Sequence, residues 1–214
     1  MRFSQYGKRE LAIFLVIPIV LFTLLSVYFE NWPLLLGALP FVWFVCNFFR
    51  DPERDIPSEE GTLVSPADGE VTAIEETQMP WIGKCHRISV FMNVFSVHVN
   101  RMPVKGQVEY VEKIPGKFLN AMNGEAATAN ERVLVGLKGE DGKKYLIAQI
   151  AGLIARNIVT PVKEGDTFEK GERFGMIKFG SRADIYVEVD QKFEARVTVG
   201  QKVSAGSDIL ASVK

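Results

Sequence analysis

Ser181 is the candidate nucleophile of this sequence, because it follows Gly180 between two strand-like runs in the segment KFGSRADIYVEV. A Gly-Ser pair is also a common turn, so the pair alone identifies no site. The segment is not a nucleophile elbow, since Phe179 and Ala183 occupy the two places where that motif requires glycine.

Three further segments contain residues suited to acid–base chemistry. Asp68 lies in VSPADGEV, His98 ends the β-rich run of FMNVFSVHVNRMP, and ANERV joins a loop to a strand at residues 129–133. Each also has a structural interpretation, as a β-turn, a partly buried histidine and a surface corner. His86 in KCHRISV is the other histidine, and we interpret it as structural or exposed.

The composition favours neither a metal site nor a disulfide framework. Cys46 and Cys85 lie far apart without a CxxC pair, and no Asp, Glu and His cluster has metal-ligand spacing. The formal net charge of −1 gives no reason to expect a nucleic-acid partner.

Taken together, the candidate segments resemble the short class of the phosphatidylserine decarboxylase family. The pieces SPADG, FSVHVNRMP, KFLNAM, NERV, QIAGLIARNIV and FGSR follow the family's order over residues 65–189, and the apolar N-terminus also fits. The longer bacterial class differs, because it has Thr where this chain has Arg182, and a second histidine where this chain has Asn100 or Arg101.

The resemblance implies a zymogen of phospholipid biosynthesis that cuts itself between Gly180 and Ser181. The large chain, residues 1–180, and the small chain, residues 181–214, would remain associated, and Ser181 would become a covalent pyruvoyl cofactor. Such a group supplies the electron sink that decarboxylation of an amino acid requires. Phosphatidylserine would then be converted to phosphatidylethanolamine through a Schiff base.

The resemblance also implies roles for His98 and Asp68. His98, oriented by Asp68, would activate Ser181 as a general base and later return a proton to carbon. The implied partners are the lipid substrate and a membrane, with a homo-oligomer left open.

Two uncharged apolar runs, residues 11–29 and 33–49, set the N-terminal quarter apart. Each run of about 17–19 residues spans about 25–28 Å as a helix, which is just adequate for a bilayer core. A cleaved signal peptide is one alternative, although the second run and the missing AxA-like site argue against it. A hairpin that dips into the bilayer without crossing it is another.

The distribution of Lys and Arg predicts the orientation of these runs. Arg2, Lys8 and Arg9 precede the first run, Arg50 and Arg54 follow the second, and the turn between them has neither residue type. The positive-inside rule therefore places the catalytic domain on the cytoplasmic side of a cell membrane.

We expect a membrane-anchoring helical hairpin in residues 1–50, a linker in residues 51–61 and a β-rich catalytic domain in residues 62–214. In DIYVEV the alternation puts Ile185, Val187 and Val189 on one face. Residues 120–130 are small and polar, which predicts a mobile loop. Strands are predicted at residues 69–74, 87–94, 107–111, 132–137, 145–150, 184–189 and 195–199.

An internal repeat supports a mainly β, barrel-sandwich-like fold. Glycine and apolar positions recur with spacings of three in two copies: Gly165, Phe168, Gly171 and Phe174, then Gly200, Val203, Gly206 and Ile209. Such half-motifs also resemble lipoyl and biotinyl carriers, because each glycine permits a tight turn. A membrane-tethered carrier or adaptor is therefore an alternative function, and a serine hydrolase with an intact Ser181 is a third.

Overall fold

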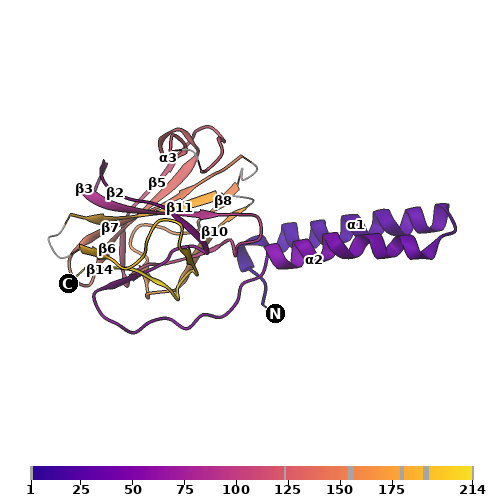
Figure 1. The fold of residues 1–214 in the computed structure, drawn as a ribbon, viewed down its shortest axis with the longest axis horizontal. Helices are drawn as coiled ribbons and strands as arrows, with labels where there is room; N and C mark the ends of the chain where they lie inside the picture. The colour runs from indigo at the N-terminus through magenta and orange to yellow at the C-terminus, as the bar shows by residue number, and fades with distance from the viewer. Residues whose placement is uncertain (1, 123, 154–156, 179–180, 190–192, 214) are drawn as a thin grey trace. The chain divides into compact units, whose positions relative to one another are not determined.

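The computed structural model describes residues 2–122, 124–153, 157–178, 181–189 and 193–213. The chain divides into two compact units, Met1–Glu53 and Arg54–Lys214. The first unit is helical, and the second is built mainly from strands (Figure 1).

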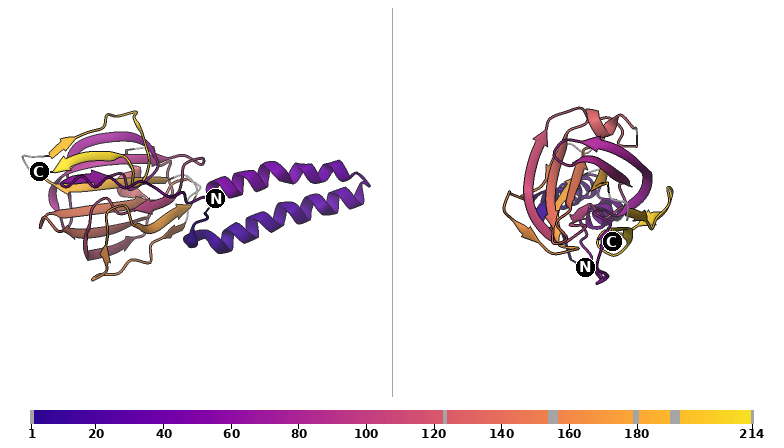
Figure 2. Two further views of the ribbon diagram at one scale, coloured as in Figure 1. Left: turned by 90° about the horizontal axis from the view of Figure 1, so that it is seen from below. Right: turned by 90° about the vertical axis from the view of Figure 1, so that its left-hand side faces the viewer.

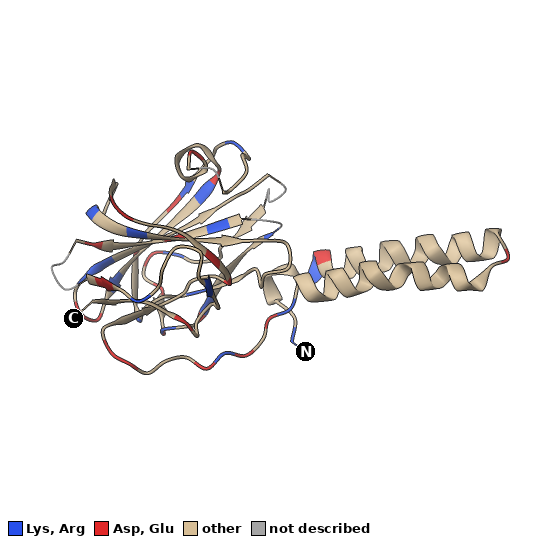
Figure 3. Cartoon of the chain, in the orientation of Figure 1, with Lys and Arg blue, Asp and Glu red and all other residues tan. Residues whose placement is uncertain are grey.

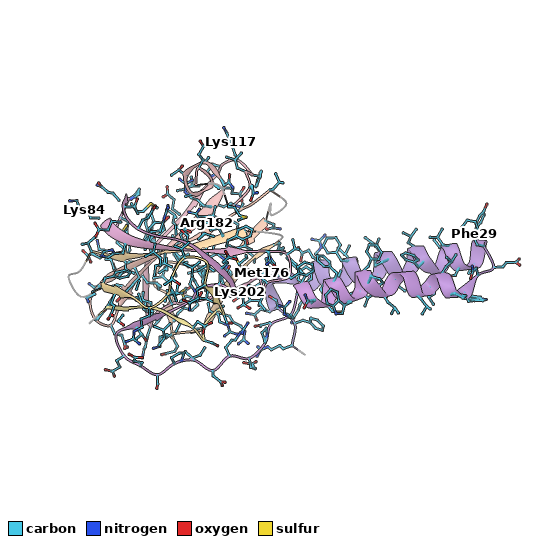
Figure 4. All side chains as sticks on the ribbon, viewed as in Figure 1. Phe29, Lys84, Lys117, Met176, Arg182 and Lys202 are labelled. Carbon is cyan, nitrogen blue, oxygen red and sulfur yellow. The ribbon has the colours of Figure 1, made fainter. Side chains whose placement is uncertain are left out.

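The first unit is a pair of apolar helices joined by a tight turn. A 3-10 turn at Gln5–Gly7 leads into α1 (Lys8–Tyr28), and a 3-10 segment, Trp32–Ala38, leads into α2 (Leu39–Phe48). Phe29, labelled in Figure 4, follows the last residue of α1. The helices pack closely, because a Cβ atom on Gly37 would lie 2.3 Å from the ring of Phe22.

The composition of α1 suits a bilayer. Gln5–Tyr28 is long and apolar enough to cross a membrane, whereas the second apolar helix, Trp32–Phe48, is shorter. Large apolar side chains lie exposed along α1, and its charged residues are confined to its first turn (Figure 3). The hydroxyl of Thr23 donates to the carbonyl of Ile19 at 2.7 Å, so this polar group is satisfied within the helix.

The described strands of the second unit form one eight-stranded sheet and two three-stranded sheets, all with antiparallel pairing. The large sheet has the order β13-β2-β3-β11-β7-β6-β5-β9, and the small sheets are β1-β14-β12 and β4-β10-β8. The strands curve around a shared core (Figure 2). Their bounds are β1 Thr62–Val64, β2 Gly69–Met79, β3 Gly83–Met92, β4 Val99–Arg101, β5 Gly106–Ile114, β6 Arg132–Gly139, β7 Lys144–Ile150, β8 Asn157–Val159, β9 Thr167–Phe168, β10 Arg173–Lys178, β11 Ser181–Glu188, β12 Phe193–Ala195, β13 Lys202–Val203 and β14 Ile209–Val213.

Strand β11 lies in the middle of the large sheet and is buried on both faces. Ile185 and Val187 face the larger hydrophobic core, as the alternation predicted, and Tyr186 faces a second, smaller cluster. Val189 follows the end of the strand and is exposed, so it does not share their buried face. A central strand with a core on each side explains why polar positions here are buried too.

The glycine repeat corresponds to two copies of one turn–strand–turn unit. The four glycines have positive φ, between 78° and 92°. In each copy a two-residue strand, β9 or β13, lies between the two turns, and a longer strand, β10 or β14, follows. The repeat is therefore a structural device of this fold, at positions where L-residues other than glycine would be strained.

The predicted fold class is confirmed as mainly β with N-terminal apolar helices, and the described strands form open sheets without a closed barrel. Two local predictions need correction. The last predicted strand, residues 195–199, is wrong beyond Ala195, because the backbone turns there and Gly200 takes a positive φ. The predicted loop at residues 120–130 contains a short helix, α3 (Ala126–Ala129).

Candidate active site

The sequence segments that carry candidate chemistry meet at one end of the large sheet. Ser181 begins β11 opposite Met92, the last residue of β3. Arg182 lies opposite Ile150, the last residue of β7, and Ile150 also lies opposite Arg132, the first residue of β6. The loops that follow β3 and β7 and the loop that precedes β6 therefore border Ser181, although they are far apart in the sequence.

Ser181 is fully buried at the start of its strand. Its Oγ lies 3.9 Å from the sulfur of Met92. The ladders to β3 and β7 hold the strand from both sides. Gly180, the other residue of the predicted cleavage site, lies outside the described residues.

A buried network of amides lies behind Ser181. The side-chain nitrogen of Asn100 lies 3.8 Å from the same Met92 sulfur and donates to the carbonyl of Pro66 at 3.2 Å. The side-chain oxygen of Asn100 accepts from Gln149 Nε2 at 2.8 Å, and Gln149 in turn accepts from the hydroxyl of Thr160. The network links the SPADG segment to the neighbourhood of Ser181.

His98 is fully buried, and one of its ring nitrogens has a described partner. Its Nδ1 lies 2.9 Å from the carbonyl oxygen of Ser96, which can only accept, so Nδ1 donates to it. The carbonyl of His98 accepts from the backbone N–H of Ile177 at 3.2 Å. His98 therefore lies beside β10, the strand that leads towards Ser181.

Asp68 forms an ion pair with Arg54 at the same end of the sheet. Its carboxylate accepts two hydrogen bonds from Arg54 Nη2, at 2.9 and 2.7 Å, and one from the backbone N–H of Ala205 at 2.7 Å. These are the contacts described for Asp68, whereas that described for His98 Nδ1 is with Ser96. The orientation of His98 by Asp68 stays a prediction.

An ion pair lies on the opposite face of β11 from Ser181. The guanidinium of Arg182 contacts both carboxylate oxygens of Asp184 at 2.6 Å, and Tyr186 donates to the same carboxylate at 3.2 Å. All three side chains are buried. Burial opposes the charge on Arg182, but the hydrogen bonds and charge of Asp184 outweigh it and raise the pKa of Arg182.

His86 and Cys85 lie away from Ser181, at the other end of β3. The ring of His86 stacks on Phe193 with centroids 4.1 Å apart, and its Nδ1 lies 3.8 Å from Glu76. Lys84, beside these residues, is labelled at that far end in Figure 4. These contacts are those of a structural histidine.

A cavity of about 510 Å³ also lies away from Ser181, at the β6–β7 turn. Lys105 bridges Glu140 and Glu169 at its wall, at 3.0 and 3.3 Å. Among the residues that the structure describes, no group of three or more His, Cys, Asp and Glu is placed to hold a metal ion.

Comparison with known proteins identifies the family. The family model described as phosphatidylserine decarboxylase matches residues 41–211. A phosphatidylserine decarboxylase proenzyme of Solidesulfovibrio magneticus is 48% identical over 200 residues, which cover 91% of this chain and 92% of the relative. A protein of the same name from Oleidesulfovibrio alaskensis is 46% identical over 186 residues, covering 86% of this chain and 84% of the relative. This chain belongs to the phosphatidylserine decarboxylase family.

Membership of the phosphatidylserine decarboxylase family makes the chain an enzyme of the carboxy-lyase class, as the sequence motifs predicted. The word proenzyme in the names of its relatives denotes a precursor form.

Some residues of the site were not singled out from the sequence. Arg54 was assigned only to the linker and to the charge pattern, and Gln149 only to a strand. The signal for Gln149 was present, because it is the one amide in the apolar run YLIAQIAG. A polar side chain inside such a run requires a buried hydrogen-bond partner.

Proposed function

We propose that this protein converts phosphatidylserine to phosphatidylethanolamine with a pyruvoyl group that it generates from Ser181. The carrying observation is the position of Ser181, which begins a central strand at the end of the sheet where the family's motif segments meet. The names of its relatives support the substrate and the precursor state.

The surroundings of Ser181 fit a pyruvoyl group at that position. Ser181 is small, buried and first in its strand, so a chain break before it leaves the ladder of Arg182–Glu188 with β3 and that of Arg182–Val187 with β7 in place. The same ladders would keep the large and small chains associated after cleavage. Once formed, the group supplies a ketone that binds the amine of the substrate and accepts the electrons released as carbon dioxide leaves.

Self-cleavage in this proposal begins with attack of Ser181 Oγ on the carbonyl carbon of Gly180. The peptide bond breaks, its nitrogen becomes an amine, and an ester joins the two residues. Loss of the Ser181 α-proton then expels the carboxylate of Gly180 and leaves a carbon–carbon double bond at residue 181. Addition of water to that residue releases ammonia and leaves the ketone.

His98 is the proposed base for this attack. Because Nδ1 donates to the carbonyl of Ser96, a neutral His98 would carry its lone pair on Nε2, and in this proposal that atom takes the proton of Ser181 Oγ. We assign Asp68 the stabilisation of the positive charge that His98 then carries. Its carboxylate is held in place by hydrogen bonds from Arg54 and from the backbone N–H of Ala205.

The proposed location is a cell membrane, with residues 1–50 as anchor, residues 51–61 as linker and the catalytic unit in the cytoplasm. The helix Gln5–Tyr28 supports membrane association, and the Lys and Arg distribution supports the orientation. A reporter that works only in the cytoplasm should be active when it is fused after Lys214, and a reporter that works only outside the cytoplasm should be inactive there. Digestion of the catalytic unit by protease added outside intact cells would contradict the orientation.

The carrier alternative is weaker. Its segment Met176-Ile177-Lys178 resembles the lysine turn of a carrier domain, but Lys178 is buried in β10 and lies opposite Asn157 in the ladder with β8. Denaturing electrophoresis and mass measurement distinguish the functions. The active protein should separate into Met1–Gly180 and a small chain beginning at residue 181 that resists Edman sequencing. Ser181→Ala should remain one chain and release no carbon dioxide, whereas Ser207→Ala should behave as wild type. A fully active, intact chain would exclude the pyruvoyl mechanism.

A further inference from the structure

Exposed apolar side chains gather on loops at the end of the sheet that holds Ser181. Five large apolar side chains are exposed among the described residues of Arg54–Lys214: Phe95 at 55%, Met122 at 62%, Leu153 at 64%, Val189 at 43% and Val199 at 62%. The first three, which we call the apolar rim, lie on three different loops.

The strand register places the apolar rim around the candidate site. Phe95 lies three residues beyond the end of β3, and Leu153 lies three residues beyond the end of β7. Met122 lies in the connection from β5 to β6. The ends of β3 and β7 are the ones that face Ser181 and Arg182 across the ladders.

Hydrogen bonds fix two of the rim loops to each other. The side-chain nitrogen of Asn130 donates to the carbonyl of Leu119 at 2.9 Å and to that of Ala151 at 2.8 Å. The backbone N–H of Ala151 donates to the carbonyl of Glu131 at 2.9 Å. Met122 and Leu153 are therefore carried by loops that are joined at their bases.

We propose that the apolar rim inserts into the boundary between headgroups and acyl chains of a bilayer, and so brings the Ser181 end of the sheet to the depth of a lipid headgroup. This inference rests on the proposed function for the identity of the lipid, phosphatidylserine. It adds a second membrane contact, separate from the helical hairpin.

A lipid surface fits the apolar rim better than a protein partner does. The three side chains stand singly, with exposed polar residues such as Asn93 and Asn120 beside them. Separate apolar side chains can each enter a bilayer interface, whereas a protein interface has a contiguous apolar centre. Lys117, exposed on the Met122 loop and labelled in Figure 4, can meet an anionic headgroup.

The hairpin makes a weak second contact effective. Because the linker joins the β-rich unit to the hairpin, a membrane-held hairpin keeps the rim at a high effective concentration near the bilayer. The apolar rim then has to orient the β-rich unit at the bilayer but does not have to recruit it to the bilayer. Its loss should therefore reduce the encounter with lipid without releasing the protein.

The first test compares two substrates for the full-length enzyme. The variant Phe95→Ser/Met122→Ser/Leu153→Ser should decarboxylate long-chain phosphatidylserine in phosphatidylcholine vesicles about tenfold more slowly than wild type. Its self-cleavage, and its turnover of monomeric dihexanoyl phosphatidylserine, should be unchanged. Val189→Ser, at the opposite end of β11, is the matched control and should leave both substrates unaffected.

A second test reports the contact directly. In a Cys46→Ser background, an environment-sensitive dye is attached to Phe95→Cys, Leu153→Cys or Val189→Cys in the full chain reconstituted into vesicles. Dyes at positions 95 and 153 should be quenched by doxyl lipids and shielded from iodide, and the dye at position 189 should show the reverse.

The outcomes separate this inference from the proposed function. Quenching by iodide at both labelled rim positions, 95 and 153, would overturn the lipid contact. An equal loss of activity on the two substrates would also overturn it, because it would place these residues in the reaction itself. If the wild-type enzyme leaves phosphatidylserine unchanged while the dyes on Phe95→Cys and Leu153→Cys stay shielded, the proposed function is refuted and the lipid contact stands.

Discussion

The side-chain amides of Asn100 and Gln149 are hydrogen-bonded to each other at 2.8 Å in the core behind Ser181. Asn100 also contacts the sulfur of Met92, and Ser181 Oγ contacts the same sulfur. A buried amide pair of this kind fixes its neighbours, because any displacement leaves a polar group without a partner in a low-dielectric environment. The pair therefore couples packing in the core to the position of Ser181.

Loss of the Gln149 amide should affect both stability and self-cleavage. Gln149→Leu leaves the Asn100 oxygen without its described donor, which should lower the free energy of unfolding by about 1–3 kcal/mol. Conversion of the precursor, followed on denaturing gels, should slow because Asn100 and Met92 shift. Gln107→Leu, at an exposed strand position, is the control and should change neither quantity. Wild-type cleavage kinetics in Gln149→Leu would separate the amide pair from the site.

The ion pair between Arg182 and Asp184 should contribute strongly to the stability of the precursor. In a Ser181→Ala background, which keeps the chain intact, Asp184→Asn leaves a buried cation without its charge partner. We expect a loss of about 3–5 kcal/mol, and a melting temperature lower by about 6–20 °C in calorimetry.

Two further variants test whether that loss comes from the ion pair. Glu188→Gln, at the exposed end of the same strand, should melt with the parent. Arg182→Met/Asp184→Leu should recover most of the loss, because two apolar side chains replace the pair. A shift below about 2 °C for Asp184→Asn would show that the pair is dispensable.

His98→Ala should separate self-cleavage from turnover. If His98 is the base for Ser181, the variant should remain uncut, since a serine hydroxyl without a base is a weak nucleophile. If His98 acts mainly on the substrate, the variant should cut itself and release little carbon dioxide. Both quantities are to be measured on one preparation, with His86→Ala as control. Asp68→Asn should show the cleavage defect in milder form. Wild-type behaviour of His98→Ala in both assays would remove His98 from the mechanism.

Local chemistry made part of the fold predictable. The glycines of the repeat were recognisable because positive φ demands a particular residue type, and the structure gives all four that conformation. The apolar helices were recognisable because nineteen and seventeen consecutive uncharged residues leave few other structures open. In both cases the residues of a short segment determine the structure of that segment.

The contacts of the site were less predictable, because they join distant segments. Arg54 meets Asp68 from the linker, and Gln149 meets Asn100 across 49 positions of sequence. The alternation in DIYVEV correctly predicted a shared apolar face for Ile185 and Val187, but it did not predict that the other face would bury Asp184 and Tyr186. Burial of that face depends on which strands flank β11, and a single segment carries no such information.

Cys85 provides a prediction for alkaline pH. Burial raises the pKa of its thiol from 9.0 to about 11, partly offset by the backbone of Met79 and the charge of Arg87. Between these two pH values the unfolded chain has released a proton that the folded protein retains, so the unfolded state binds fewer protons and stability falls as pH rises. Cys85→Ala removes this contribution. In the Ser181→Ala background, urea unfolding should therefore show that the loss in free energy of unfolding caused by Cys85→Ala is smaller at pH 10 than at pH 8. Leu134→Ala, a cavity variant in the same cluster without a titrating group, should keep a constant deficit. Parallel pH profiles for the two variants would show that the thiol does not titrate differently in the folded protein.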